Sequence, residues 1–318
     1  MNDTLSIVLS AAFQICVVLL AAPFITGVIK KTKARMQNRK GAGLLQPYSD
    51  LLKLLKKEVI LSSSASWIFR VTPYIVFTSM LVIALLIPTL AVPVPLHWIG
   101  DIITIVYLLA LGRFFVALAG LDVASAFGGI GSSREMSISS IVEPAMMLAI
   151  VASAVTAGST DLSVIVASLV TSPVTLVHPA HMLAFVGLFI VMLAETGRIP
   201  VDNPETHLEL TMIHEAMILE YSGRYLAFIE WASQMKLFLF LALLSNMFFP
   251  VGIAASLQPG ALIIGAAALI AKVVVLAVAV AVIESTNAKL RLFRVPELLM
   301  VAFILSLLAL ILYFIIGG

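Results

Sequence analysis

The sequence is poor in charged residues and in cysteine, and both shortages limit what the protein can be. Only 11% of its 318 residues are charged while 61% are hydrophobic, and the mean hydropathy is +1.13. Soluble globular chains are about 25% charged, so the composition predicts a protein embedded in lipid. The single cysteine, Cys16, can form no internal disulfide and cannot supply the four ligands of an iron–sulfur cluster. We therefore expect no cofactor, no metal and no redox centre in this chain, and no nucleic-acid partner.

Long apolar runs recur at the length that a bilayer requires. A hydrocarbon core of about 30 Å needs roughly 20 apolar residues in a helix, and helices satisfy their own backbone groups in lipid. We predict an all-α membrane protein, one integral domain over residues 1–318, with about eight transmembrane helices. The predicted spans are 4–28, 70–92, 101–119, 136–157, 181–197, 234–255, 261–283 and 297–316. The apolar stretch 162–170 is too short to cross and is interpreted as a half-helix.

Lysine and arginine outside these spans gather in alternate loops. The loops 29–69, 120–135, 198–233 and 284–296 hold them, whereas the loops 93–100, 158–180 and 256–260 hold none. By the positive-inside rule the first set faces the cytoplasm. The prediction is therefore a multi-pass protein of the cell (cytoplasmic) membrane with its basic and acidic loops in the cytoplasm and both termini outside.

Two segments between the spans have an unusual composition. In residues 41–58 leucines and lysines fall on opposite sides of a helix, which predicts an amphipathic helix lying on the membrane surface; a sharper hypothesis places it at the mouth of a cavity. Residues 195–234 contain seven of the chain's 17 acidic residues. Pro200 and Pro204 exclude a simple helix at the start of this stretch, so residues 198–233 are predicted to form an acidic cytoplasmic loop.

Several ionisable residues fall inside the predicted spans. Such a group costs about 2.5–3.5 kcal/mol on insertion scales, so it normally faces a protein interior or water. Lys272 lies near the middle of its span and Glu143 within another, and both are candidates for a proton path, with structural ion pairs as the alternative. For Arg113 and Glu284, which lie nearer the span ends, we expect the side chains to reach out toward the interface.

Three stretches are similar to subunit 1 of respiratory complex I and its relatives. They are Gly-Leu-Leu-Gln-Pro with Lys-Leu-Leu-Lys-Lys-Glu at 43–58, Val-Glu-Pro-Ala at 142–145, and Ala-Glu-Thr-Gly-Arg-Ile-Pro-Val-Asp-Asn-Pro-Glu-Thr-His at 194–207, which continues into Glu-Tyr-Ser-Gly at 220–223. The relatives include the membrane anchor subunits of formate hydrogenlyase, of membrane-bound nickel–iron hydrogenases and of sulfane reductase. The resemblance covers essentially the whole chain, and the 194–223 stretch is its most specific part.

The resemblance implies a role for the acidic residues. In this family the loop between spans five and six faces a peripheral redox module, and acids there and in the spans begin a proton path. Glu143, Glu195, Glu215 and Glu220 match such positions, while Lys272 joins them from burial alone. The loop residues expected to dock the peripheral module are Arg198, Asp202, Glu205, His207, Glu209, His214, Tyr221 and Arg224.

Residues 202–217 resemble the hydrogenase branch rather than the quinone-binding branch of this family. The resemblance therefore implies a membrane anchor and proton- or ion-coupling subunit of a hydrogenase-type complex. Its expected partners are hydrogenase-like large and small subunits with a nickel–iron centre, an iron–sulfur subunit and antiporter-like membrane subunits. The alternatives are the quinone-site subunit of an NADH dehydrogenase-type complex, the equivalent subunit of a sulfane reductase, a stand-alone transporter and a structural tether.

Overall fold

A computed structural model describes residues 3–92, 94–95, 100–171, 178–203, 212–254 and 256–316, and within these ranges the chain forms helices and no strand. The helices are α1 (Asp3–Met36), α2 (Gln46–Lys56), α3 (Trp67–Leu86), α4 (Ile102–Asp122), α5 (Ala126–Ala157), α6 (Leu162–Thr171), α7 (Pro179–Glu195), α8 (His214–Ile218), α9 (Gly223–Phe248), α10 (Pro259–Thr286), the 3-10 turn η3 (Leu292–Arg294) and α11 (Val295–Ile316).

The predicted all-α membrane fold is confirmed. Seven of the helices among the described residues are long and apolar enough to cross a bilayer, and α7, with 17 residues, occupies the position of the short fifth span. The predicted half-helix corresponds to α6 and the predicted amphipathic segment contains α2. The largest difference is at α9, which begins at Gly223 rather than near residue 234. The acidic loop is therefore shorter than predicted, because its last residues are helical.

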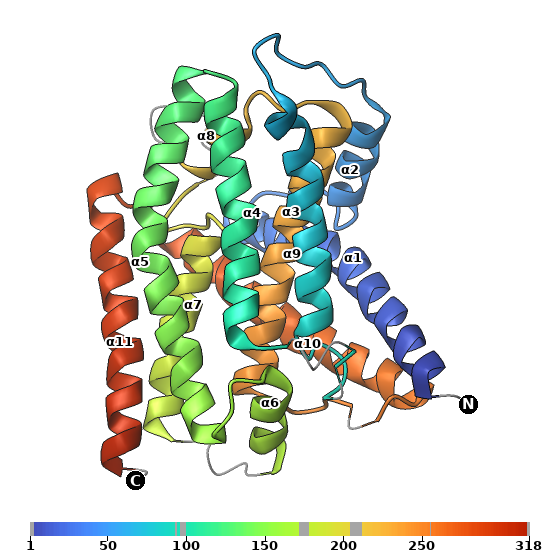
Figure 1. The fold of residues 1–318 in the computed structure, drawn as a ribbon, viewed down its shortest axis with the longest axis vertical. Coiled ribbons are helices and arrows are strands. Elements are labelled where there is room, and N and C mark those ends of the chain that lie inside the picture. The colour runs from blue at the N-terminus through green and yellow to red at the C-terminus, as the bar shows by residue number, and fades with distance from the viewer. Residues whose placement is uncertain are drawn as a thin grey trace.

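Most of the long helices stand upright, and α1 and α10 lie inclined across them (Figure 1). The upright ones are α3, α4, α5, α7, α9 and α11, while α1 and α10 pack against each other at an angle to the rest. The segments that connect the helices at the upper side of Figure 1 are rich in charge, and we call this side the basic end; it comprises residues 37–66, 122–126, 196–203, 212–222 and 287–294. The start of α1 and the end of α11 lie at the opposite side.

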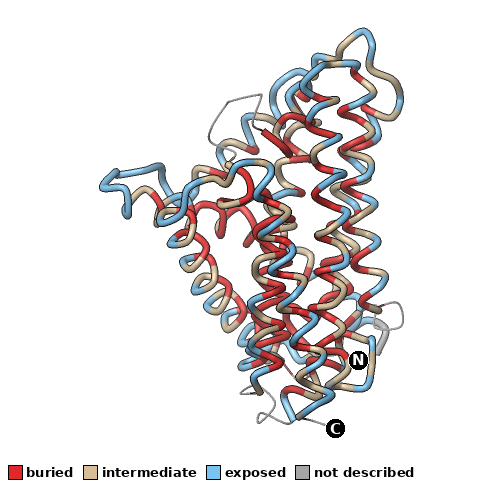
Figure 2. The backbone as a smooth tube through the Cα atoms, turned by 90° about the vertical axis from the view of Figure 1, so that its left-hand side faces the viewer, coloured by how far each residue is buried: buried red, intermediate tan, exposed pale blue. Residues whose placement is uncertain are grey.

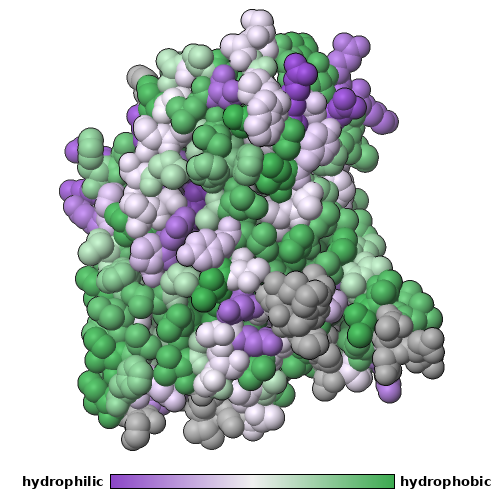
Figure 3. Space-filling view, viewed as in Figure 1, coloured by the Kyte–Doolittle hydropathy of each residue, from purple (hydrophilic) through white to green (hydrophobic). Residues whose placement is uncertain are grey.

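Burial is deepest along α9, where every residue from Leu237 to Phe248 is buried. Figure 2 shows the buried colour concentrated inside the bundle and the exposed colour on its outer turns and loops. The outer surfaces of the other long helices expose large apolar side chains, among them Val275 and Phe314. Figure 3 shows the hydrophobic colour spread over the lower and middle part of the face, with the hydrophilic colour mainly toward the basic end. Exposed apolar belts of this kind need lipid around them, as expected of a multi-pass membrane protein.

Proline lies inside α1, α3 and α5, and in α1 and α3 a side chain from a distant segment supplies the hydrogen bond that proline removes. Proline lacks an N–H, so it frees the carbonyl four residues before it. Pro23 in α1 frees the Leu19 carbonyl, which accepts a hydrogen bond of 3.2 Å from the indole N–H of Trp231 in α9. Beside it the Tyr48 hydroxyl of α2 donates to the Leu20 carbonyl.

The internal proline of α3 is compensated in the same way. Pro73 frees the Phe69 carbonyl, and the Tyr221 hydroxyl donates to it at 2.9 Å. The Tyr221 ring also stacks on the Phe69 ring, with centroids 3.8 Å apart and planes 6° from parallel. Backbone groups freed within a bilayer need such partners, so these aromatic side chains fix the positions of α1 and α3 against α9 and the segment that precedes it.

Replacing Tyr221 with Phe should remove the hydrogen bond to the Phe69 carbonyl while it keeps the stacked ring. We expect a loss of about 1 kcal/mol in the free energy of unfolding, because a buried carbonyl then lacks its donor. Thermal unfolding of the purified protein in mild detergent measures this. Tyr107→Phe is the matched control, because Tyr107 is 67% exposed on α4; equal unfolding temperatures for both variants would contradict the assigned bond.

Candidate functional site

A cavity of about 380 Å³ opens among α1, α4, α5, α8, α9 and α10 near the basic end. One part of its wall is apolar, with Ile29, Val76, Met80, Leu109, Val116 and Leu237. The other part carries six cationic and six acidic side chains: Lys30, Lys33, Arg113, Arg198, His214 and Lys236, with Glu135, Glu195, Asp202, Glu215, Glu230 and Glu284. At roughly 30 Å³ per molecule, the volume is that of a small cluster of water molecules.

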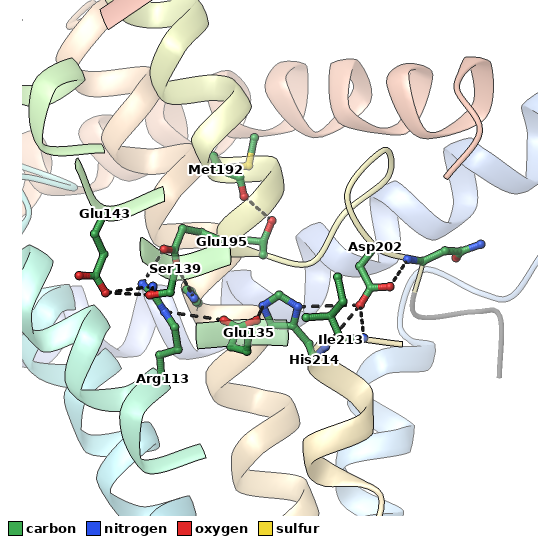
Figure 4. Close-up of polar contacts among 12 residues, drawn as sticks. Arg113, Glu135, Ser139, Glu143, Met192, Glu195, Asp202, Ile213 and His214 are labelled. Atoms are coloured by element: carbon green, nitrogen blue, oxygen red, sulfur yellow. Dashed lines mark hydrogen bonds and ion pairs between the residues drawn. The ribbon is translucent and has the colours of Figure 1, made fainter. Parts of the chain in front are cut away.

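Arg113 of α4 is the centre of the charged wall (Figure 4). Its Nη2 lies 2.6 Å from Glu195 Oε1 at the end of α7, and its Nη1 lies 3.1 Å from Glu143 Oε1 of α5. Its Nε lies 3.7 Å from Oε1 of Glu135, which also belongs to α5, and its Nη1 also donates to Ser139. A guanidinium has five donors in a rigid fork, which is why one arginine serves three carboxylates.

Glu195 is buried between two cations. Its second oxygen, Oε2, lies 2.6 Å from the Lys236 ammonium of α9, so this carboxylate joins α7 to α9 as well as to α4. Buried charges are stable only when they are paired. The arrangement therefore explains how Glu195 and Arg113 stay charged in the interior of the bundle.

His214, at the start of α8, connects this centre to the loop at the basic end. Its Nε2 lies 3.3 Å from Glu135 Oε2 and its Nδ1 lies 3.9 Å from Asp202 Oδ2. Asp202 Oδ1 in turn lies 2.7 Å from the Lys289 ammonium. Figure 4 shows Glu143, Arg113, Glu135, His214 and Asp202 in one row, which we call the ionic chain.

The two carboxylates set the charge of His214. Burial alone would lower the pKa of the imidazole, but the charge of Glu135 and the nearby carboxylate of Asp202 raise its pKa to about 10. Burial likewise acts to raise the pKa of Asp202, but His214 and Lys289 hold it well below its ordinary value. His214 is therefore a cation and Asp202 an anion near neutral pH, and the loop is tied to the centre by charge.

A second ionic group lies on the opposite wall of the cavity. Glu284 of α10 lies 3.2 Å from Arg198 and 3.4 Å from the Lys33 ammonium of α1. The expectation that Arg113 and Glu284 reach out to the interface is wrong, because both residues are buried, at 7% and 5% exposure. Partners on other helices, which no single helix reveals, compensate their charge inside the bundle.

Glu215 of α8 is half-buried and lines the same cavity. Burial is the main cause that raises its pKa to about 7, and the nearby charge of Glu230 adds to the shift, while His214 opposes it. A carboxyl group with such a pKa exchanges its proton near neutral pH. It is the group in the cavity that is best suited to take up and release a proton.

The remaining predicted residues are divided between surface and interior. Glu220 and Arg224 are exposed at the basic end, and Tyr221 is buried against Phe69. Glu205, His207 and Glu209 lie outside the described residues. The structure thus brings Glu143, Glu195, Arg198, Asp202, His214 and Glu215 together around one cavity or on the chain of ions that leads from it.

Lys272 lies apart from these residues. Its ammonium donates to Asn246 Oδ1 at 2.6 Å and to the Phe249 carbonyl at 3.0 Å, so it caps the C-terminal end of α9. Asn246 in turn donates to the Pro88 and Thr89 carbonyls after α3. Among the described residues Lys272 has no ion pair with an acid, and its place on a proton path stays a prediction.

Sequence reasoning missed Glu135, Glu230 and Lys236. Glu135 is four residues before Ser139 and eight before Glu143, so the three share one face of α5, and this spacing could have found it. Lys236 lies within the predicted span 234–255, so its insertion cost already indicated a buried partner. Within the described residues no group of three His, Cys, Asp or Glu side chains is arranged to hold a metal.

Comparisons with known proteins identify the family and agree with the fold. Residues 9–315 match the family profile described as NADH dehydrogenase. The chain is 34% identical to formate hydrogenlyase subunit 4 and 35% identical to hydrogenase-4 component C, both of Escherichia coli K12, over 95% of its length and 97% and 95% of theirs. It is 35% identical to a subunit of the NADH-quinone oxidoreductase of Syntrophotalea carbinolica, over 70% of this chain and 72% of that one.

Among solved structures, the fold is similar to a chain of the archaeal membrane-bound sulfane sulfur reductase complex. The TM-score is 0.82 with 20% identity, over 95% of this chain and 99% of that one. The resemblance to subunit 1 of complex I, and to its hydrogenase branch, is confirmed by these relatives.

Replacing Arg113 with Met should destabilise the bundle strongly. The change leaves Glu195 and Glu135 buried beside fewer cations, and removal of one partner from a buried pair typically costs about 3–5 kcal/mol. Unfolding in detergent, followed by circular dichroism, measures the effect. Arg224→Met is the control, because Arg224 is exposed; a similar small change in both variants would refute the central position of Arg113.

In infrared difference spectra the carboxyl band of Glu215 should titrate near pH 7. The band is assigned to Glu215 by its absence from the spectra of the Glu215→Gln variant. Glu230→Gln should lower this pKa, because it removes the neighbouring negative charge. Because the pKa of Glu215 is raised from 4.5 in the folded protein, its protonated form favours the folded state. This contribution to the free energy of unfolding is lost as the pH rises through about 7. Glu220→Gln, at an exposed position, should leave the titration unchanged; a Glu215 band that titrates near pH 4.5 in the unsubstituted protein would overturn the assignment.

Proposed function

The chain belongs to the NADH dehydrogenase family, and we propose that it is the membrane anchor and proton- or ion-coupling subunit of a complex I-like hydrogenase complex. The names and the nearly full coverage of formate hydrogenlyase subunit 4 and hydrogenase-4 component C support the hydrogenase assignment. The observation that carries the coupling role is the ionic chain, which runs from Asp202 in the loop to Glu143 within a membrane span.

Coupling follows from the way in which the ionic chain shares its charges. A change of charge beside the loop alters the contacts of His214 with Asp202 and Glu135. Because Glu135 also faces Arg113, the guanidinium then redistributes its contacts among Glu135, Glu195 and Glu143. Glu143, whose side chain is 37% exposed, takes up or releases the proton at the far end. Glu215 supplies protons to the cavity from the other side.

The basic end is the side on which the peripheral partners dock, and it faces the cytoplasm. Glu220 and Arg224 are exposed there, next to the loop that carries Asp202 and His214. The partners are hydrogenase-like large and small subunits with the nickel–iron centre, an iron–sulfur subunit and antiporter-like membrane subunits. Electron transfer takes place in those partners, and this chain converts its effect on the loop into proton movement.

A second candidate function is binding of a quinone. The apolar part of the cavity wall and the identity to the NADH-quinone oxidoreductase relative favour it. Solvent extraction of the purified complex decides between the two: stoichiometric bound quinone, with activity sensitive to cavity inhibitors, would favour the quinone site. The sulfane reductase chain supports the fold but not a choice of substrate.

Replacing Glu143 or Glu215 with Gln should lower proton translocation by the complex in vesicles at least tenfold, because each is a proton-exchanging group of the path. Redox turnover with a soluble donor should persist, because it belongs to the peripheral subunits. In the same assay Lys272→Met tests whether Lys272, placed on the path from its burial alone, is needed for proton translocation. Glu220→Gln tests the same for Glu220, which is exposed at the basic end. If both Glu143→Gln and Glu215→Gln left pumping intact, the chain would be a tether only.

A further inference from the structure

A second cavity, of about 240 Å³, lies beneath α2 beside the first. It is lined by Lys30, Pro47, Asp50, Leu51, Leu54, Leu226, Glu230 and Gln234. Lys30, Glu230 and Gln234 also line the main cavity, so the two spaces share a wall. Lys30 is exposed, which places this wall within reach of the surrounding medium.

The shared wall is polar and lacks one hydrogen bond. Gln234 Oε1 is buried, and no donor from the described part of the chain reaches it. Buried side-chain acceptors are nearly always satisfied, so a wall that carries such an acceptor between two cavities is suited to hydrogen-bonded water. The leucines of the second cavity do not supply a donor.

Three carboxyl groups lead through the two cavities in order. Asp50 lines only the second cavity, Glu230 lines both, and Glu215 lines only the main one. Each is near enough to act electrostatically on the next, Asp50 on Glu230 and Glu230 on Glu215. Lys30 acts electrostatically on both glutamates, and His214 and Asp202 also act on Glu215, so cations lie beside the route.

The outer side of α2 shows where this route begins. Lys53, Lys56, Leu52 and Leu55 are exposed on it while Leu51 is buried against the bundle, which is the pattern of a helix at a lipid–water interface. The second cavity lies beneath this helix, and Asp202 and His214 are not among the residues that line it.

We infer that the second cavity is an aqueous inlet, through which Asp50 and Glu230 pass protons from the membrane surface to Glu215. A proton taken from water by Asp50 moves to Glu230 and then to Glu215, and each carboxylate regains its negative charge when the proton leaves. The inlet rests on the proposed function, because it feeds the cavity from which the ionic chain starts. It gives that cavity a source of protons separate from the peripheral partner.

The test blocks the inlet chemically in the assembled complex. In a Cys16→Ser background, Leu54→Cys places a thiol in the wall of the second cavity, and a bulky, charged, membrane-impermeant methanethiosulfonate then fills it. Leu52→Cys is the matched control, because Leu52 is 58% exposed on the same helix. The readout is the rate at which the Glu215 infrared band responds to a pH jump.

We expect modification of Leu54→Cys to slow this response at least tenfold and modification of Leu52→Cys to leave it unchanged. Asp50→Asn should slow it without any reagent. An unchanged rate in blocked Leu54→Cys, or labelling of this thiol only by apolar reagents, would overturn the inlet and make the space a lipid-facing groove. A slowed rate with undiminished pumping would support the inlet and refute the proposed coupling role instead, so the two failures are distinguishable.

Discussion

The structure depends on one buried arginine. Arg113 of α4 contacts Glu135, Glu143 and Glu195, and without it α5 and α7 would hold like charges close together in the interior of the bundle. With Lys236, Lys289 and protonated His214, the part of this group that lies in the described residues has four cations against four carboxylates, Asp202 being the fourth. A group balanced in this way is stable as a whole, and it responds as a whole, because one added proton leaves a net charge that the interior tolerates poorly.

This balance explains how a membrane span and a loop can influence each other. His214 belongs to the loop region by its position and to the bundle by its contact with Glu135. Its neighbour Glu215 faces the cavity with a pKa near neutrality. In the proposed mechanism the ion pairs transmit the change, and Glu215 exchanges a proton near neutral pH. The two properties lie on adjacent residues of one short helix, so a small shift of α8 affects both.

The spans could be predicted from the sequence because lipid imposes one length and one composition on every crossing helix. The half-helix α6 and the amphipathic α2 followed from the same rule. The centre of the site could not be found this way, because Arg113 meets partners 30 and 82 residues away along the chain. The position of Arg113 near the end of its span predicted a side chain that reaches the interface, but its contacts with α5 and α7 keep it buried.

For Lys272 the difference runs the other way. Its position near the middle of a span predicted a proton-path residue, whereas its contacts are those of a helix cap. The start of α9 was missed because Arg224 and Glu230 have the composition of a loop, although Glu230 faces a cavity.

The carbonyl that Pro23 leaves without a helical hydrogen bond has a consequence for the synthesis of the protein. The Leu19 carbonyl receives its hydrogen bond from Trp231, which is 212 residues further along the chain. During synthesis the first helix therefore reaches the bilayer long before its partner exists, with a polar group open to hydrocarbon. An unsatisfied carbonyl in lipid costs several kcal/mol, so α1 gains its full stability in the membrane only after α9 has been translated and packed beside it.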